Sequence, residues 1–490
     1  MKKINKILSL LIALGLIIGI FSGCEKKESV GSDITKLKWY VCFQEQPDFD
    51  EVQEEINKIL REKINAEIEI KRLDMAGYKE QIKLIISANE DYDLAFCSPM
   101  FGWDTFQKSG AFMPLDDLLK EYAPKSYGQI PEEYWNAARG DDGKIYGFLN
   151  YQIVARRGGF VAVKDDVEKT GFDFSTIKKA SDVTPILAKL KEQNPDCIPI
   201  AVENSTARTY LRDNNIRGID GTQICAMNFA DNTNYNVFNL YETPEYEEKI
   251  AMIRDWYNKG YVDKDAATTS NLREKIGAGK IKIWYETGIN PGIETSLKEI
   301  AGGKDVVTSI LHPAMIEKSN INATMTCINA NSKNPEKAMQ FLEMLNTNED
   351  NIYNILNFGI EGKHYNKVSE NRIEQIENSG WNPNMAWEFG NQFNAYILPG
   401  QEDSVWEETK QLNKESAISP LYGFAFDDSN VKNEISNCEA ITTEYCPALE
   451  TGAVDYTKYL PEFIEKLRSA GSEKIIEEVQ RQVDEWKAKK

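Results

Sequence analysis

The sequence predicts an α/β fold with largely parallel sheets. Apolar segments of strand length alternate with segments whose apolar residues recur at helical spacing, over most of the 490 residues. Strands separated by helices of this length pair in parallel, and the helices then cover both faces of the sheet. No internal repeat, low-complexity tract or glycine-rich phosphate loop interrupts the pattern.

The first units show the pattern most clearly. Strands and helices are expected, in order, at 37–43, 48–64, 66–73, 77–89 and 92–98. In the first helix Val52, Ile56 and Leu60 fall on one face. Because ligands collect at the carboxyl ends of parallel strands, the loops after the first and third strands, 44–48 and 98–106, are expected to face a ligand.

The alternation continues toward the C-terminus and ends in helix. Further strands are expected at 158–166, 280–288 and 322–330. Further helices are expected near 179–193, 244–259 and 334–346. From residue 403 onward helical periodicity dominates, so the C-terminal region is predicted to be helical.

The N-terminus has the features of an export signal. Three lysines precede residues 7–21, which are apolar or small except for Ser9. As a helix this run would span about 22 Å, which is shorter than the roughly 30 Å core of a membrane. The small residues Ser22 and Gly23 follow it, as at a cleavage site. We expect a signal peptide at 1–24 and a polar linker at 25–36, and a retained membrane anchor is the alternative.

Composition excludes several classes of function. The formal charge of −20 opposes binding to nucleic acid. The two histidines, His312 and His364, are too few for a multi-histidine metal site, so neither a metal nor another cofactor is expected. No catalytic signature is present, and the 77 acidic residues make neighbouring carboxylates unavoidable by chance. Beyond Cys24 the cysteines form no CxxC pair, which favours free, buried thiols.

Several motifs together resemble a known family. They are SGAFMPLDDLL (109–119), GKIYGFLNYQ (143–152) and the strand, turn and helix of 323–347. In this order they resemble family 1 bacterial extracellular solute-binding proteins, the capture components of ABC importers for sugars. The motifs WEFGNQFNAY (387–396) and SPLYGFAFD (419–427) resemble a lipoprotein subgroup labelled as aldouronate- or oligosaccharide-binding. The stretch FSGC (21–24) similarly resembles a lipobox, in which the cysteine, here Cys24, is lipidated.

The resemblance implies a two-lobe periplasmic-binding-protein-like fold with a hinge, plus a helical C-terminal region. Lobe 1 would comprise 37–148 and 326–362, and lobe 2 would comprise 149–325 and 363–490. The chain would cross between the lobes near 148–151, 322–325 and 359–364. Ligand would favour the closed arrangement, which a membrane permease would recognise.

The candidate ligand-binding residues follow from the chemistry of sugars, which present apolar faces and a rim of hydroxyls. Trp103 and Asp104 follow a strand end, although Trp103 could instead be an ordinary core residue. Glu286 ends a strand on which Trp284 or Tyr285 is expected in the core. Gln44 follows the first strand.

The strongest cluster of candidates lies at 387–391. Trp387 falls where the family commonly stacks a sugar, and Phe389 and Asn391 accompany it. Gln152 and Arg156 lie just beyond the first crossing. Arg156 could bind the carboxylate of a uronic acid with its guanidinium fork, although a solvated arginine is the alternative.

These observations predict a protein that performs no bond chemistry. It would be a lipid-anchored, monomeric component of an ABC importer on the outer face of the cell membrane, and it would deliver an oligosaccharide to permease subunits. The oligosaccharide could contain uronic acid. The alternatives are an exported enzyme that acts on polysaccharides, and a binding protein for peptides or another small solute.

Overall fold

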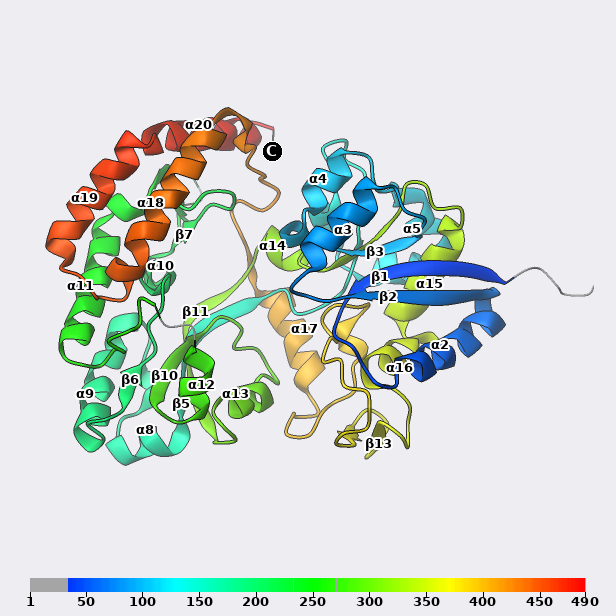
Figure 1. The fold of residues 1–490 in the computed structure, drawn as a ribbon, viewed down its shortest axis with the longest axis horizontal. Helices are drawn as coiled ribbons and strands as arrows, with labels where there is room; N and C mark the ends of the chain where they lie inside the picture. The colour runs from blue at the N-terminus through cyan, green and yellow to red at the C-terminus, as the bar shows by residue number, and fades with distance from the viewer. Residues whose placement is uncertain (1–33, 232, 269–270, 490) are drawn as a thin grey trace, which may run out of the picture.

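The computed structural model describes residues 34–231, 233–268 and 271–489. Two α/β lobes lie side by side and are joined by extended segments of chain (Figure 1). The expected two-lobe α/β architecture is therefore confirmed. The predicted signal peptide with Cys24 lies outside the described residues, and Thr35 and Lys36 of the predicted linker already belong to the first strand.

The first lobe is built on a five-stranded sheet with the order β2-β1-β3-β12-β4. β1, β2 and β3 are parallel, as predicted, whereas β12 runs antiparallel to its neighbours. The strands of this lobe are β1 (Thr35–Cys42), β2 (Ala66–Leu73), β3 (Leu94–Cys97), β4 (Phe148–Leu149), β12 (Met325–Ile328), β13 (Tyr365–Lys367) and β14 (Ile373–Gln375). Its helices are α2 (Phe49–Ile64), α3 (Tyr78–Ser87), α4 (Trp103–Lys108), α5 (Asp116–Tyr122), α6 (Pro124–Gln129), α7 (Glu132–Trp135), α14 (Lys318–Ile321), α15 (Pro335–Thr347), α16 (Ile352–Phe358) and α17 (Val405–Glu415).

The core of the first lobe forms because alternate residues of β1 face the helices. Trp39 is fully buried and makes edge contacts with Phe341 of α15, at a centroid distance of 5.4 Å, and with Phe389, at 5.2 Å. On α2 the predicted apolar face, including Val52 and Ile56, is buried against the same core.

The second lobe is built on a mixed sheet with the order β15-β11-β5-β10-β6. The expectation of a largely parallel sheet is wrong here, because β5 is antiparallel to both β10 and β11. The chain enters this lobe along β5 and leaves it along β11, so these two strands must run in opposite directions. The strands are β5 (Arg156–Val163), β6 (Ile198–Ile200), β7 (Ile216–Gly218), β8 (Cys225–Asn228), β9 (Val237–Asn239), β10 (Ile281–Glu286), β11 (Val306–Ile316) and β15 (Ala417–Ile418).

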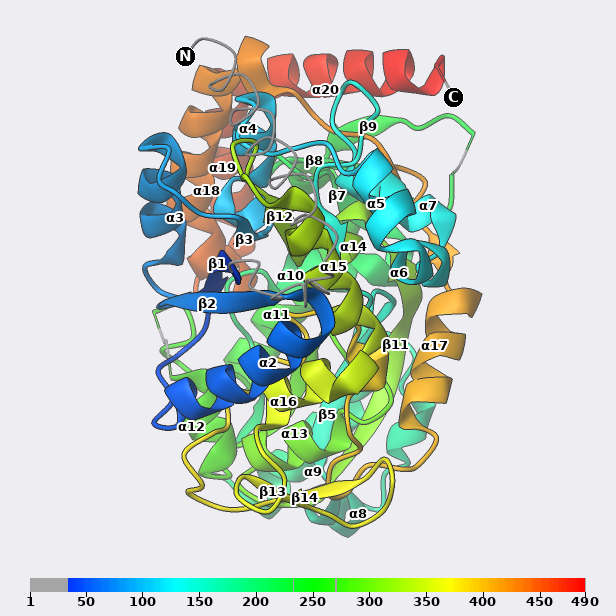
Figure 2. The same ribbon diagram turned by 90° about the vertical axis from the view of Figure 1, so that its right-hand side faces the viewer.

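Helices complete the second lobe and form its C-terminal region. They are α8 (Lys164–Thr170), α9 (Thr184–Gln193), α10 (Thr206–Tyr210), α11 (Pro244–Asn258), α12 (Leu272–Gly277), α13 (Glu294–Ile300), α18 (Lys432–Glu450), α19 (Tyr456–Ser469) and α20 (Ser472–Lys487). The last three pack together, with Tyr445 stacked on Phe463 at 5.4 Å. Figure 2 shows α20 lying across the top of this lobe.

The segment 363–398 belongs to the first lobe rather than to the second. Tyr365, Ile373, Trp381, Phe389 and Tyr396 are all buried in the core of the first lobe. The expected boundary after residue 362 is therefore wrong, and the chain returns to the second lobe only after α17, at β15. Long-range aromatic packing holds this segment, which has little regular structure of its own.

Three further findings concern side chains and membranes. The seven cysteines from Cys42 to Cys446 that the structure describes are free thiols and all are buried, as expected. The described part of the chain contains no group of His, Cys, Asp and Glu that could hold a metal ion. Within residues 34–231, 233–268 and 271–489 no helix is long and apolar enough to cross a membrane.

Candidate ligand-binding groove

Three segments of chain cross between the lobes and pack against one another. They are 150–155, 317–324 and 416–431. The buried Gln152 donates a hydrogen bond of 2.7 Å from Nε2 to Oγ1 of Thr324, which joins the first crossing to the second. The backbone oxygen of Gln152 accepts a hydrogen bond of 3.0 Å from Nδ2 of Asn413 on α17. The first crossing is therefore hydrogen-bonded to the second and to α17, the helix that leads into the third crossing, and we call this arrangement the hinge.

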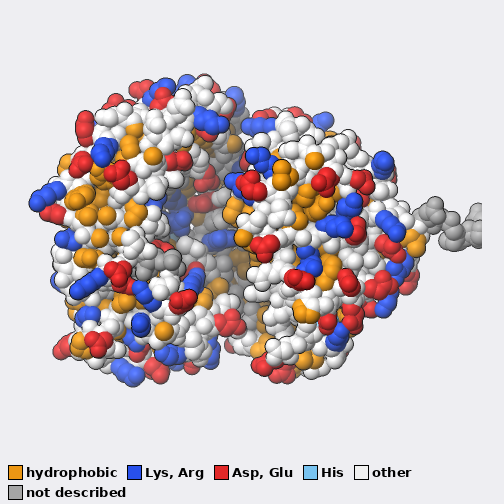
Figure 3. All heavy atoms as spheres, in the orientation of Figure 1, with side chains coloured by type: hydrophobic (Ala, Val, Ile, Leu, Met, Phe, Trp, Pro, Cys, Tyr) orange, Lys and Arg blue, Asp and Glu red, His pale blue; other side chains and the backbone are white. Residues whose placement is uncertain are grey.

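A groove separates the two lobes, and the space-filling view shows it as a deep hollow between them (Figure 3). One pocket of this groove, of about 340 Å³, is lined from both sides. The second lobe contributes Asn290 and Thr295, and the first lobe contributes Trp387, Tyr396 and Trp406. We call it the tryptophan pocket. Residues of both lobes can therefore contact one ligand in it.

Trp387 is the exposed aromatic residue of this pocket, with 37% of its surface accessible. Two hydrogen bonds hold the chain at Trp387 and at the residue after it. The backbone oxygen of Trp387 accepts a hydrogen bond of 3.3 Å from Thr324 Oγ1. The next residue, Glu388, is fully buried and accepts a hydrogen bond of 2.9 Å from the backbone nitrogen of Cys42. Burial raises the pKa of Glu388 well above its usual range, which favours the neutral carboxyl group.

Two amide oxygens of the tryptophan pocket lack hydrogen-bond donors. Oδ1 of Asn290 and Oδ1 of Asn357 are buried, and no donor among the described residues reaches them. They belong to opposite lobes. The amide of Asn357 is oriented by Nδ2, which donates to the backbone oxygen of Tyr353 at 2.8 Å. Both oxygens are enclosed by protein in this arrangement of the lobes, so a ligand hydroxyl could donate to them only after the pocket opens.

The structure brings only part of the predicted site to the groove. Trp103 and Phe389 are 2% and 1% exposed and lie in the core of the first lobe, so the expectation that they contact ligand is not met. Phe389 is held there by edge contacts with Trp39 and Phe43. Asn391 is also buried, and its Oδ1 accepts a hydrogen bond of 3.0 Å from the backbone nitrogen of Phe393.

The remaining candidates are more accessible. Gln44, Asp104 and Arg156 are exposed. Glu286 is half-buried at the end of β10 and forms an ion pair with Arg273 at 3.2 Å. Of the two aromatics before it, Trp284 is the more deeply buried. Gln152, by contrast, is buried and serves the hinge, because its side chain binds Thr324 of the second crossing and its backbone oxygen binds Asn413 of α17.

A second pocket, of about 360 Å³, lies in the second lobe and was not predicted. Three arginines line it, Arg208, Arg212 and Arg217, and Glu317 lines it from the second crossing. We call it the arginine pocket. Arg217 pairs with Glu317 at 3.3 Å, whereas no carboxylate of the described chain lies within ion-pair distance of Arg212. The sequence does place these three arginines within ten residues of one another, and this spacing could have indicated an anion-binding site.

The positive potential of the arginine pocket acts on a histidine behind it. His312 is 2% exposed, and its Nδ1 lies 3.8 Å from Oδ1 of Asp213. Burial, together with the charges of Arg212 and Arg217, lowers the pKa of His312 to about 3. The imidazole is therefore neutral at physiological pH.

Comparison with protein families decides what kind of groove this is. Residues 45–352 match the model of the bacterial extracellular solute-binding proteins. The chain belongs to this family. The expectation that it is a binding protein and not an enzyme is thus confirmed. Residues 420–488 match a second model, which describes a domain of unknown function.

Relatives of this solute-binding protein cover three quarters or more of its length. A carbohydrate ABC transporter substrate-binding protein of Streptococcus pneumoniae is 29% identical over 96% of this chain and 94% of its own. The polygalacturonan/rhamnogalacturonan-binding protein YtcQ of Bacillus subtilis is 21% identical, over 76% of this chain and 77% of its own. The crystal structure of the N-glycan transport solute-binding protein NgtS of S. pneumoniae, 29% identical, matches 93% of this chain and 100% of that one with a TM-score of 0.82.

Proposed function

We propose that this solute-binding protein captures an oligosaccharide between its two lobes for an ABC importer. The tryptophan pocket carries the proposal, because it combines the exposed ring of Trp387 with polar side chains from both lobes. Aromatic rings bind the apolar face of a sugar, and amide oxygens accept hydrogen bonds from its hydroxyl groups. The carbohydrate-binding relatives support the same ligand class.

The proposed mechanism is closure about the hinge. A ligand that contacts both lobes binds the closed arrangement more tightly and shifts the population toward it. Structures of NgtS in complex with Man1GlcNAc and Man5GlcNAc match this chain with TM-scores of 0.71 and 0.69, compared with 0.82 for the first NgtS structure. Because the three structures are of one protein, the lower scores support a different arrangement of the lobes when sugar is present.

The tryptophan pocket favours an uncharged sugar ring. Among the described residues that line it, only Glu299 carries a charge. A uronic acid unit, the second candidate, is favoured instead by the arginine pocket. Arg212 could bind a carboxylate there with its guanidinium fork.

The proposal also covers the location and partners of the protein. The lipobox-like Cys24 supports anchoring by lipid to the outer face of the cell membrane, where two acyl chains suffice for stable attachment. From there the protein would deliver ligand, as a monomer, to permease subunits. Membership of an extracellular family supports a location outside the cytoplasm.

Calorimetry combined with small-angle scattering tests the function. We expect the chain to bind either Man5GlcNAc or an oligogalacturonide and to return it uncut, and we expect the radius of gyration to fall on saturation. A control peptide of similar mass should not bind. Cleavage of the sugar would favour the enzyme alternative, and an unchanged radius at saturation would contradict closure.

A further inference from the structure

The part of the chain that matches a domain of unknown function begins beside the arginine pocket. Its first residues belong to the third crossing, 416–431. We call residues 419–431 of this crossing the wall segment. Leu421, Phe424 and Phe426 are half-buried and line a hollow beside Phe229 of the second lobe. This hollow shares Gly218, Ile219, Asp220 and Glu317 with the arginine pocket. The aromatic side chains of the wall segment therefore border the arginine pocket.

The wall segment has little regular structure of its own. Only the short 3-10 turn at Asp428–Asn430 is regular within it. It also touches the first lobe, because the hydroxyl of Tyr422 donates a hydrogen bond of 2.6 Å to the backbone oxygen of Glu133. A segment of this kind keeps one conformation only if neighbouring elements hold it.

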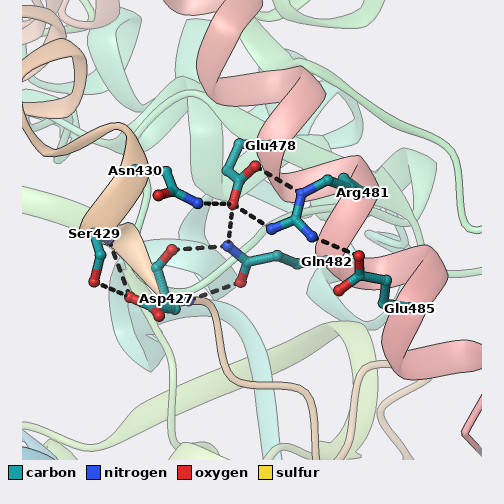
Figure 4. A network of polar contacts seen from close by, with 7 residues as sticks. All are labelled: Asp427, Ser429, Asn430, Glu478, Arg481, Gln482 and Glu485. Carbon is teal, nitrogen blue, oxygen red and sulfur yellow. Dashed lines mark hydrogen bonds and ion pairs between the residues drawn. The ribbon is translucent and has the colours of Figure 1, made fainter.

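α20 holds the wall segment through one side chain that binds the backbone twice. The backbone nitrogen of Asp427 donates a hydrogen bond of 2.9 Å to Oε1 of Gln482. Nε2 of Gln482 donates a hydrogen bond of 2.8 Å to the backbone oxygen of Asp427. Figure 4 shows both contacts. Gln482 thus fixes both backbone polar groups of a single residue, Asp427, which follows the two phenylalanines.

Two other residues on the same face of α20 support this contact. Glu478, one turn before Gln482, accepts hydrogen bonds from Nδ2 of Asn430 at 3.0 Å and from Nε2 of Gln482 at 2.7 Å (Figure 4). Arg481 also binds Glu478, and these contacts lower the pKa of Glu478 to about 2. One turn after Gln482, Trp486 makes an edge contact with Phe424 at a centroid distance of 5.8 Å. Residues four apart share a helix face, so the three contacts form one continuous row.

We infer that the domain of unknown function completes the carbohydrate site, with α20 positioning the wall segment so that Phe424 and Phe426 contact the sugar. Gln482 is a positioning residue, and the two phenylalanines are ligand contacts. The inference rests on the proposed function, because it assigns a further wall to the same groove. The chemistry required is that of a sugar whose apolar ring face meets an aromatic side chain.

Binding measurements on the full chain test the inference, with Man5GlcNAc and an oligogalacturonide as probes. Phe424→Leu and Phe426→Leu keep an apolar side chain but remove the ring, and each is expected to weaken binding about tenfold. Gln482→Met removes both hydrogen bonds to Asp427 while it keeps a side chain of similar length. It is expected to weaken binding several-fold through faster dissociation. Glu485→Gln, which changes only a contact of Arg481, is the matched control and is expected to bind as the wild type does.

Hydrogen exchange separates positioning from a general loss of stability. In Gln482→Met the amide of Asp427 should exchange faster while amides in the core of α11 keep their protection. In the wild type, bound sugar should slow exchange across the wall segment. Wild-type affinity in Gln482→Met or in both phenylalanine variants would overturn the inference and leave the proposed function standing. A wild-type chain that binds neither probe would overturn both.

Discussion

Oδ1 of Asn413, on α17, accepts a hydrogen bond of 3.0 Å from the backbone nitrogen of Ala155, on the first crossing segment. The same oxygen accepts a second one from the nitrogen of Val154 at 3.2 Å, while Nδ2 donates to the backbone oxygen of Gln152. All four residues are buried. One side chain therefore satisfies three backbone groups of the hinge and makes the first crossing and α17 move together.

Asn413→Ala should destabilise the protein at its hinge. Two backbone N–H groups and one carbonyl would lose their partners in a buried site, so the free energy of unfolding should fall by about 2 kcal/mol. Chemical denaturation measures it. Gln411→Ala, an exposed position on the same helix, is the control and should change the free energy little. Equal stability of the two variants would contradict the role of Asn413.

Trp387 and Phe389 should give opposite results although they stand two residues apart. Trp387→Ala removes an exposed ring from the groove, so oligosaccharide affinity should fall by about tenfold or more with little change in stability. Phe389→Ala removes a ring from the core, so the free energy of unfolding should fall by about 3 kcal/mol or more. Calorimetry and denaturation on both variants measure the two effects. If Trp387→Ala bound oligosaccharide as tightly as the wild type, the ligand site would not lie at Trp387.

This pair also shows how far the sequence predicts the site. Both aromatics lie in one motif without a clear period, so local pattern cannot tell which of them is exposed. The answer depends on Trp39 and Phe43, which lie far away in the sequence and enclose Phe389. By contrast, the buried face of α2 was predictable because Val52 and Ile56 repeat at helical spacing.

Distant contacts also explain the error at the third crossing. Residues 363–398 contain few regular elements, and the segment stays in the first lobe because Trp381 and Tyr396 are buried there. The arginine pocket was missed for a related reason. Arg212 and Arg217 stand on different local elements, and only the fold of the second lobe places them beside Glu317.

His312 should make the stability of the protein depend on pH. Its pKa is about 3 in the folded chain, below the 6.5 of an unperturbed histidine. Between these values the unfolded chain binds a proton that the folded chain does not, so stability falls as pH falls, by at most about 1.4 kcal/mol per pH unit. Besides Arg212, Arg217 and Asp213, Lys249 also acts on this imidazole.

His312→Gln should remove this contribution. Denaturation curves at pH 7, 5.5 and 4.5 would show the wild type losing more stability on acidification than the variant. The carboxylates elsewhere titrate in both proteins and cancel in the comparison. A constant difference between the two proteins across this range would contradict a neutral His312.

Cys24→Ala should release the protein from the membrane. Without the cysteine no lipid can be attached, and the chain should then appear in the soluble fraction of cells or in the medium. Fractionation with an antibody against the folded chain measures this. Cys42→Ala, at a buried thiol, is the control and should leave the distribution unchanged. Equal membrane retention in Cys24→Ala and the wild type would contradict lipid anchoring.

Variants of Arg212 and Arg156 test whether the ligand carries a carboxylate. Arg212 lines the arginine pocket without a carboxylate partner in the described chain, whereas Arg156 is exposed at the start of β5. If the ligand contains uronic acid, Arg212→Gln should weaken binding of an oligogalacturonide about tenfold, because the carboxylate loses a bidentate, charge-assisted contact. Binding of Man5GlcNAc should change much less, because a neutral sugar has no carboxylate for the guanidinium group of Arg212 to bind.

Arg156→Gln is the matched control and should leave both affinities near those of the wild type. Calorimetry with the two sugars and the two variants separates the possibilities. A loss confined to Arg156→Gln would restore the residue that the sequence suggested for carboxylate binding. An equal loss for both sugars in Arg212→Gln would assign this arginine to hydroxyl binding and remove the support for an acidic ligand.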